Sequence, residues 1–284
     1  MTTKMKLDLR PLSDALGAEV RGLDLSQKLD GATIAALRQA WFDHLILLFR
    51  DQDLTQEQLV EATSYFGALG QLARPEEYRT PGQKKLHQTV MLISNVRENG
   101  VPIGALPDGE MMFHHDMLHA EIPHNGTLLY AREIPSTGGN TLFANLYKAY
   151  ETLPEEIRAP LEGKRAFHHY NYGEQIKGDN KGVPAFAESR HPVFRTHPET
   201  GKKAIYVNRL MTEYVEGLPR QESDRLLARV FDHAEDRRFV YEHVWRVGDA
   251  MLWDNRCSMH ARTDFPPERR LFWRTTVSGT EKPH

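Results

Sequence analysis

Short apolar segments recur along the chain from about residue 89, and they constrain the fold more than any other feature of the sequence. Glycine, proline and asparagine separate them, a pattern typical of strands in an all-β sandwich or barrel. His197–Lys203 predicts a hairpin connection between two of these strands. We therefore expect a mainly β core. The segments are Val90–Asn95, Thr127–Glu133, Pro192–Thr196, Ala204–Asn208, Phe239–Val247, Ala250–Asp254 and Leu271–Ser278.

Helical patterns precede these segments. Ala32–Phe49 has apolar residues every three or four positions and then a continuous apolar run, which predicts a helix to about Asp43 followed by a buried strand. Thr55 and Gln58 form a capping-box pattern that begins a second helix, and Gly67 can end it. The fold class is therefore mainly β with flanking helices.

The C-terminal half adds one helix and one polar segment. Glu222–Ala234 predicts a helix between strands. Gly173–Glu188 is polar and contains glycine and proline, so we expect a mobile loop or lid there. We find no repeat, low-complexity tract or Ser/Gly-rich linker. Residues 1–284 are therefore expected to form one domain.

Charge and cysteine content exclude several classes of protein. The chain has 36 Lys and Arg against 39 Asp and Glu, so its net charge of −3 leaves no basic excess to neutralise phosphates, and we expect no nucleic-acid partner. No apolar run reaches the ~18–20 residues of a membrane span, so we expect no membrane partner. The single cysteine, Cys257, excludes an internal disulfide and is compatible with a reducing cytoplasm.

Phe113–His119 is the segment richest in metal-ligating side chains. Residues i and i+2 of an extended strand project to the same side, so His114 and Asp116 could bind one metal ion while His115 points away. His260, which follows a strand and a polar turn, could return as a third ligand. Two histidines and one carboxylate with open positions suit non-haem Fe(II) oxygenases. A surface histidine beside a turn aspartate is the alternative.

A zinc site is a competing interpretation of the same segment. His115 and His119 are four residues apart and could share a helical face. Zinc proteases of this kind have glutamate directly after the first histidine, where this chain has Asp116. The zinc interpretation is therefore the weaker one.

Arginines of the last predicted strand indicate bound anions. Arg270, Phe272 and Arg274 would share one face of an extended strand. An unpaired guanidinium inside a barrel costs several kcal/mol, so an inward arginine implies an anion or a protein carboxylate beside it. Thr141, after a glycine turn, could offer its hydroxyl to the same anion. An edge strand with both arginines in solvent is the alternative.

In this order, the motifs resemble the taurine dioxygenase / 2,4-dichlorophenoxyacetate dioxygenase family of Fe(II)/2-oxoglutarate oxygenases over nearly the whole chain. Phenylalanine stands where the family's metal motif has tryptophan. The segments that carry the resemblance are Gly22–Leu25, Ile46–Asp51, Phe113–Asp116, Pro135–Thr141, Trp253–Arg256, His260 and Arg270.

The resemblance implies a double-stranded β-helix (jelly-roll) core that contains an iron site. By position, His114, Asp116 and His260 would bind Fe(II). Thr141 and Arg270 would bind the distal carboxylate of the cosubstrate 2-oxoglutarate.

The resemblance also implies the reaction. Trp253 would lie beside 2-oxoglutarate, and Arg274 matches a position that meets the acidic group of the substrate in relatives. The implied enzyme uses O2, hydroxylates a small acidic organic substrate, with cleavage as a further outcome, and releases succinate and CO2. No side-chain acid, base or nucleophile beyond the metal ligands is expected. Relatives commonly form dimers or tetramers, so we expect a homo-oligomer.

The substrate stays open on the sequence alone. One set of positions could line an apolar pocket, but the same residues are equally compatible with an ordinary core. A cupin-like metal-dependent isomerase or hydrolase without 2-oxoglutarate, and a non-catalytic jelly-roll binding protein, are the alternative functions. The positions in question are Met111, Met112, Met117, Leu118 and His168–Tyr172.

Overall fold

Strands dominate the computed structural model, which describes residues 6–72, 79–104, 111–170 and 187–284. The helices are α1 (Gly31–His44), α2 (Gln56–Ser64), α3 (Pro81–Lys84), α4 (Leu146–Glu151), α5 (Glu155–Arg158) and α7 (Arg220–Ala234), with 3₁₀ turns η2 (Ala159–Leu161) and η3 (Arg237–Phe239). The strands are β1 (Asp8–Pro11), β2 (Ala18–Arg21), β3 (Ile46–Phe49), β4 (Met91–Ser94), β5 (Arg97–Glu98), β6 (Val101–Pro102), β7 (Met111–His114), β8 (Gly126–Glu133), β9 (Thr141–Asn145), β10 (Arg165–Tyr170), β11 (Ala187–Pro192), β12 (Phe194–Thr196), β13 (Lys203–Ile205), β14 (Thr212–Val215), β15 (Val240–His243), β16 (Ala250–Asp254), β17 (Ser258–Arg262) and β18 (Leu271–Val277).

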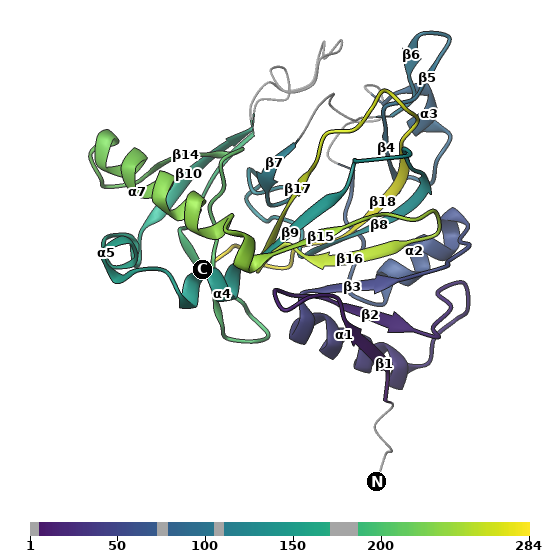
Figure 1. Cartoon of the computed structure of the whole chain (residues 1–284), viewed down its shortest axis with the longest axis horizontal. Coiled ribbons are helices and arrows are strands. Elements are labelled where there is room, and N and C mark those ends of the chain that lie inside the picture. Colours follow the sequence, from purple (N-terminus) through teal and green to yellow (C-terminus); the bar gives the residue numbers. More distant parts are fainter. Residues whose placement is uncertain (1–5, 73–78, 105–110, 171–186) are drawn as a thin grey trace.

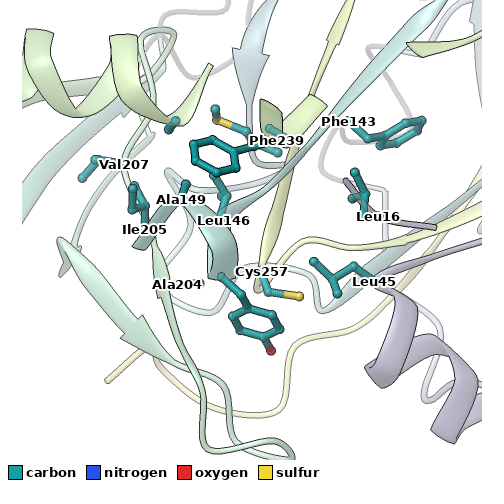
Figure 2. Packing of buried hydrophobic residues seen from close by; sticks show 14 of the residues in the cluster. Leu16, Leu45, Phe143, Leu146, Ala149, Ala204, Ile205, Val207, Phe239 and Cys257 are labelled. Atoms are coloured by element: carbon teal, nitrogen blue, oxygen red, sulfur yellow. The ribbon is translucent and has the colours of Figure 1, made fainter. Parts of the chain in front are cut away.

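Two sheets form the core. One has seven strands in the order β1-β2-β3-β16-β8-β18-β4, and the other has four in the order β15-β9-β17-β7 (Figure 1). Apart from the parallel β2–β3 pair, neighbouring strands in both sheets are antiparallel. The largest buried cluster draws residues from both sheets and from α4 and α7, including Phe143, Leu146 and Phe239 (Figure 2). The expected mainly β fold with flanking helices is confirmed.

The continuous apolar run of β3 is explained by what covers its two faces. Ile46 and Leu48 belong to the cluster between the sheets, whereas Leu47 and Phe49 belong to a second cluster with α1 and α2. Successive side chains of a strand point to opposite faces, so a strand buried on both faces is apolar throughout. Helices α1 and α2 therefore form an outer layer over the seven-stranded sheet.

The predicted local elements agree with the structure at most positions. The helix and strand predicted within Ala32–Phe49 are α1 and β3, and the capping box of Thr55 and Gln58 is complete. The predicted hairpin at His197–Lys203 joins β12 to β13. Helix α2 ends at Ser64, before Gly67, and α7 begins at Arg220 instead of Glu222.

Two further predictions concern the lid and the membrane. The predicted lid lies outside the described residues, apart from Ala187 and Glu188, which begin β11. Within the described ranges, no helix combines the length and apolar character needed to cross a bilayer.

Candidate functional site

A pocket of about 200 Å³ lies between residues of the two sheets. Its wall combines β7, β9 and β17 of the smaller sheet with β4, β8, β16 and β18 of the larger one. Every site residue predicted from the sequence lines it: His114, Asp116, Thr141, Trp253, His260, Arg270 and Arg274.

Three of these residues converge on one point of the wall. His114 on β7 lies directly opposite His260 on β17, and their ring centroids are 4.2 Å apart. His114 Nε2 is 4.0 Å from Asp116 Oδ1. One ligand atom from each of the three side chains lies within 4.8 Å of the others. Such a spacing would allow all three to contact one metal ion.

Asp116 lies beside His114, as predicted, but the two residues do not both belong to a strand. Strand β7 ends at His114, and Asp116 begins the turn that follows, in which Met117 has a φ of +60°. The carboxylate therefore approaches His114 because the chain reverses there, and not because the two residues alternate along a strand.

The protonation states of the three side chains suit metal binding. His114 Nδ1 lies 2.9 Å from the Met112 carbonyl, which can only accept, so Nδ1 carries the proton and Nε2 keeps its lone pair. Burial lowers the pKa of His114 and of His260. Burial alone would raise the pKa of Asp116, but Arg274 and the two histidines hold it below its usual range.

The surroundings of His260 and the types of the three side chains also suit a divalent metal. His260 Nδ1 is buried and has no hydrogen-bond partner among the described residues. Two neutral imidazoles and one carboxylate, facing a pocket, are the ligands of non-haem Fe(II) sites. The residues present therefore fit such an ion.

Arg270 places a buried positive charge in the same pocket. Its side chain is 2% exposed, Nη2 donates to the Gly139 carbonyl at 3.2 Å, and the guanidinium carbon lies 4.1 Å from the centroid of the Phe272 ring. Among the described residues no carboxylate lies within 4.0 Å of it, and its Nε has no partner. Burial, with nearby Arg262, lowers its pKa to about 9. An anionic ligand would neutralise this charge.

Thr141, Trp253 and Arg274 complete the predicted set. Thr141 begins β9, and its hydroxyl accepts a hydrogen bond from Trp245 Nε1 at 3.0 Å. The Trp253 ring lies 4.6 Å from that of His260. Arg274 Nη1 donates to Asp116 Oδ1 at 3.2 Å, so this arginine meets a protein carboxylate, one of the two partners that the sequence allowed.

The zinc interpretation is not supported by the structure. Residues 116–119 form a turn, so there is no helix on which His115 and His119 could share a face. His115 is buried and its Nδ1 lies 3.1 Å from Asn208 Nδ2, whereas the His119 ring packs beside Tyr170. His115 thus points away from His114 and Asp116, as predicted.

The positions that the sequence left open between pocket lining and ordinary core are divided by the structure. Met111, Met117 and Tyr170 line the pocket. Met112 is 47% exposed, and Leu118 is buried in a separate cluster with Tyr206.

Sequence reasoning missed three residues. Arg262 lines the pocket two positions after His260 on β17, so strand alternation could have found it. Thr127 donates to Asp116 Oδ2 at 2.6 Å, and Asn255 donates to Thr127 Oγ1 at 3.0 Å. No local pattern links these last two to the metal ligands.

The chain is similar to known proteins in both sequence and structure. The family model "Taurine catabolism dioxygenase TauD, TfdA family" matches residues 8–276. The chain is 31% identical to an (S)-phenoxypropionate/alpha-ketoglutarate-dioxygenase of Sphingobium herbicidovorans, over 96% of this chain and 95% of the relative. It is 30% identical to an alpha-ketoglutarate-dependent 2,4-dichlorophenoxyacetate dioxygenase of Cupriavidus pinatubonensis, over 96% and 98%. A solved taurine dioxygenase from Burkholderia xenovorans aligns with a TM-score of 0.80 at 31% identity, over 96% of this chain and 90% of that chain.

These relatives decide between the functions that the sequence left open. They are dioxygenases that depend on alpha-ketoglutarate, another name for 2-oxoglutarate, which supports neither the cupin-like isomerase or hydrolase nor the non-catalytic binding protein. The fold they share has a jelly-roll core, as expected. The chain therefore belongs to the TauD/TfdA family and is an oxidoreductase, a dioxygenase that uses Fe(II), 2-oxoglutarate and O2.

Proposed function

We propose that the chain hydroxylates a small organic acid with an apolar body, and that His114, Asp116 and His260 hold the iron. The observation that carries the proposal is the convergence of these three donors within 4.8 Å, on the wall of a pocket that also contains the buried Arg270. Fe(II), when bound, supplies the redox chemistry that couples hydroxylation to conversion of 2-oxoglutarate into succinate and CO2.

Arg270 and Thr141 are proposed to bind the distal carboxylate of 2-oxoglutarate, with Trp253 beside it. The guanidinium offers several donors in one plane, which match the two oxygens of a carboxylate. Because Arg270 is buried, its attraction to an anion is screened less than it would be at the surface. The role of these residues is to bind and orient the cosubstrate; we assign no side-chain acid, base or nucleophile.

Arg274 is proposed to bind the acidic group of the substrate. It lines the pocket together with apolar side chains, among them Met91, Met117, Leu210 and Met211, and its Nη2 lies 3.0 Å from Met91 Sδ. Methionine side chains adapt to irregular apolar groups. This lining favours an acid with an aryl or alkyl body over taurine, whose chain is short and polar.

The proposal is tested by a panel of acids assayed with Fe(II) and 2-oxoglutarate. We expect aryloxyalkanoic acids to raise succinate release above the rate without substrate, and taurine to raise it least. A rate that no acid raises, or that taurine raises most, would contradict the proposed substrate class. Mass spectrometry of the products distinguishes hydroxylation from cleavage.

We further propose that residues 1–284 act as one domain and that the chain forms a homo-oligomer in the cytoplasm. The first and last strands, β1 and β18, belong to the same sheet, which supports a single unit. The free thiol of Cys257 is compatible with a reducing compartment. Light scattering coupled to gel filtration measures the assembly, and cell fractionation measures the location.

A further inference from the structure

The two oxygens of Asp116 have different neighbours. Oδ1 lies on the side of His114 and Arg274, at 4.0 Å from His114 Nε2 and 3.2 Å from Arg274 Nη1. Oδ2 accepts a hydrogen bond of 2.6 Å from the Thr127 hydroxyl on β8. Each oxygen thus has one hydrogen-bond donor, and Oδ1 is the oxygen on the side of His114, the neighbouring proposed ligand.

The direction of the Thr127 hydroxyl is fixed by a chain of groups behind it. The Trp253 indole can only donate, and it donates to Asn255 Oδ1 at 2.9 Å. The Asn255 amide nitrogen therefore faces Thr127, where it donates to Oγ1 at 3.0 Å. A hydroxyl has one proton, and with its oxygen accepting from Asn255 that proton points to the acceptor-only carboxylate of Asp116.

The chain is enclosed in the core, so no water is needed to complete it. Thr127 and Asn255 are fully buried, and Trp253 is 1% exposed. Trp253 and Thr127 are directly paired across β16 and β8, and Asn255 follows the end of β16. Strand pairing therefore sets the spacing of all three groups, and the carboxylate meets a prearranged donor.

We propose that Thr127 is a positioning residue for the metal centre: its hydroxyl occupies Asp116 Oδ2, leaves Oδ1 as the oxygen that meets the metal, and is itself aimed by Asn255. This inference rests on the proposed role of Asp116 as a metal ligand. Groups that orient metal ligands in this way contribute to affinity because they remove the freedom of the ligand to rotate.

The test measures Mn(II) binding to the full metal-free chain, from the EPR signal of the free ion. Thr127→Val keeps the shape of the side chain but removes the donor, and we expect it to weaken Mn(II) binding about 10–100-fold. Thr127→Ser keeps the hydroxyl and should restore most of the affinity. Asn255→Leu removes the group that aims the hydroxyl and should weaken binding to an intermediate degree.

Thr63→Val is the matched control. Thr63 is also fully buried, and its hydroxyl bonds to Leu59 O and Thr275 Oγ1 instead of to Asp116. It should lower stability without changing Mn(II) affinity. Equal affinity of Thr127→Val and the wild type, while Asp116→Ala no longer binds, would overturn the positioning role and leave the metal site intact. A wild type that binds no Mn(II) would overturn both proposals.

Discussion

Among the described residues, two clusters of possible metal ligands each contain a histidine and a buried aspartate, yet only one of them faces a pocket. The first is His114, Asp116 and His260; the second is His197, Asp254 and Cys257, whose possible ligand atoms also lie within 4.8 Å of one another. Both clusters contain an aspartate that is at least nine-tenths buried and a histidine beside it. Residue type and spacing alone do not separate them.

The difference lies in the surroundings of the aspartate: Asp116 lines the pocket and meets an arginine at one oxygen only, whereas an arginine donates to both oxygens of Asp254. Asp254 accepts from Arg256 at both oxygens, at 2.8 and 2.6 Å, and from His197 Nε2 at 3.1 Å. Burial raises the pKa of the Cys257 thiol, which disfavours the thiolate that a metal would need. The cluster therefore serves as an ion pair that holds the turn between β16 and β17. A candidate metal site in a folded core is thus recognised by ligand atoms that face a pocket and are not fully occupied by hydrogen bonds within the protein.

The largest effect is expected from Asp116→Ala. Removing the only carboxylate of the first cluster should abolish Mn(II) binding and substrate-dependent succinate release, because two imidazoles alone leave the ion without a charged ligand. Titration of the metal-free chain and the succinate assay both measure this. Normal turnover by the variant would show that the first cluster is not the metal site.

Arg256→Gln changes the second cluster, where we expect a loss of stability and no loss of metal binding. It leaves the buried Asp254 carboxylate without its cation, so we expect the free energy of unfolding to fall by about 3–5 kcal/mol. Urea denaturation measures this fall, and folded protein should still bind Mn(II). Arg220→Gln is the control, because it removes an exposed i,i+4 ion pair worth about 0.5 kcal/mol or less. Loss of metal binding with unchanged stability would reverse the roles of the two clusters.

Arg270→Gln should affect the cosubstrate and leave metal binding intact. Removing the charged partner of a buried carboxylate costs about 2–5 kcal/mol, so the KM for 2-oxoglutarate should rise at least ~30-fold. The neighbouring Arg269 is exposed and pairs with Glu133, so Arg269→Gln is a matched control that should leave the KM unchanged. An equal KM for both variants would mean that Arg270 does not bind 2-oxoglutarate.

The smallest effect concerns acid stability. Burial lowers the pKa of His191 to about 4. An unfolded histidine has a pKa of about 6.5, so below that pH His191 binds a proton in the unfolded chain but stays neutral in the folded chain until the pH approaches 4. The stability from this neutral histidine is therefore present above pH 6.5 and lost as the pH falls toward 4, by ~1–3 kcal/mol.

Asp254 of the second cluster should not contribute in that range. Burial alone would raise the pKa of Asp254, but Arg256 holds it below its usual range, so its contribution is present above the unfolded aspartate pKa and is lost only in stronger acid. His191→Gln should accordingly flatten the fall in the free energy of unfolding between pH 6.5 and 4. An unchanged slope would assign the fall to other groups.

Much of the molecule could be predicted from local sequence. Capping residues, the spacing of apolar side chains and the glycine turns determined α1, α2, α7 and most strands, because each depends on neighbours a few residues apart. The order of the motifs also predicted that seven residues share one site, and all seven line one pocket. Their roles as ligands stay proposals.

Only the tertiary structure decided which groups meet across the core. Asn255 and Thr127 are 128 positions apart, and Arg274 and Asp116 are 158 apart. The first contact follows from the register of β16 and β8, and the second from the packing of the two sheets, because β18 and β7 belong to different sheets. A shift of one residue in a strand would turn its side chains to the opposite face. Strand pairing also leaves His260 facing the pocket. The contact between Arg256 and Asp254 is local, because the two residues are only two positions apart in the chain. The sequence determined which chemistry the chain carries, and the packing of the two sheets decided that Asp116, beside two histidines, faces the pocket.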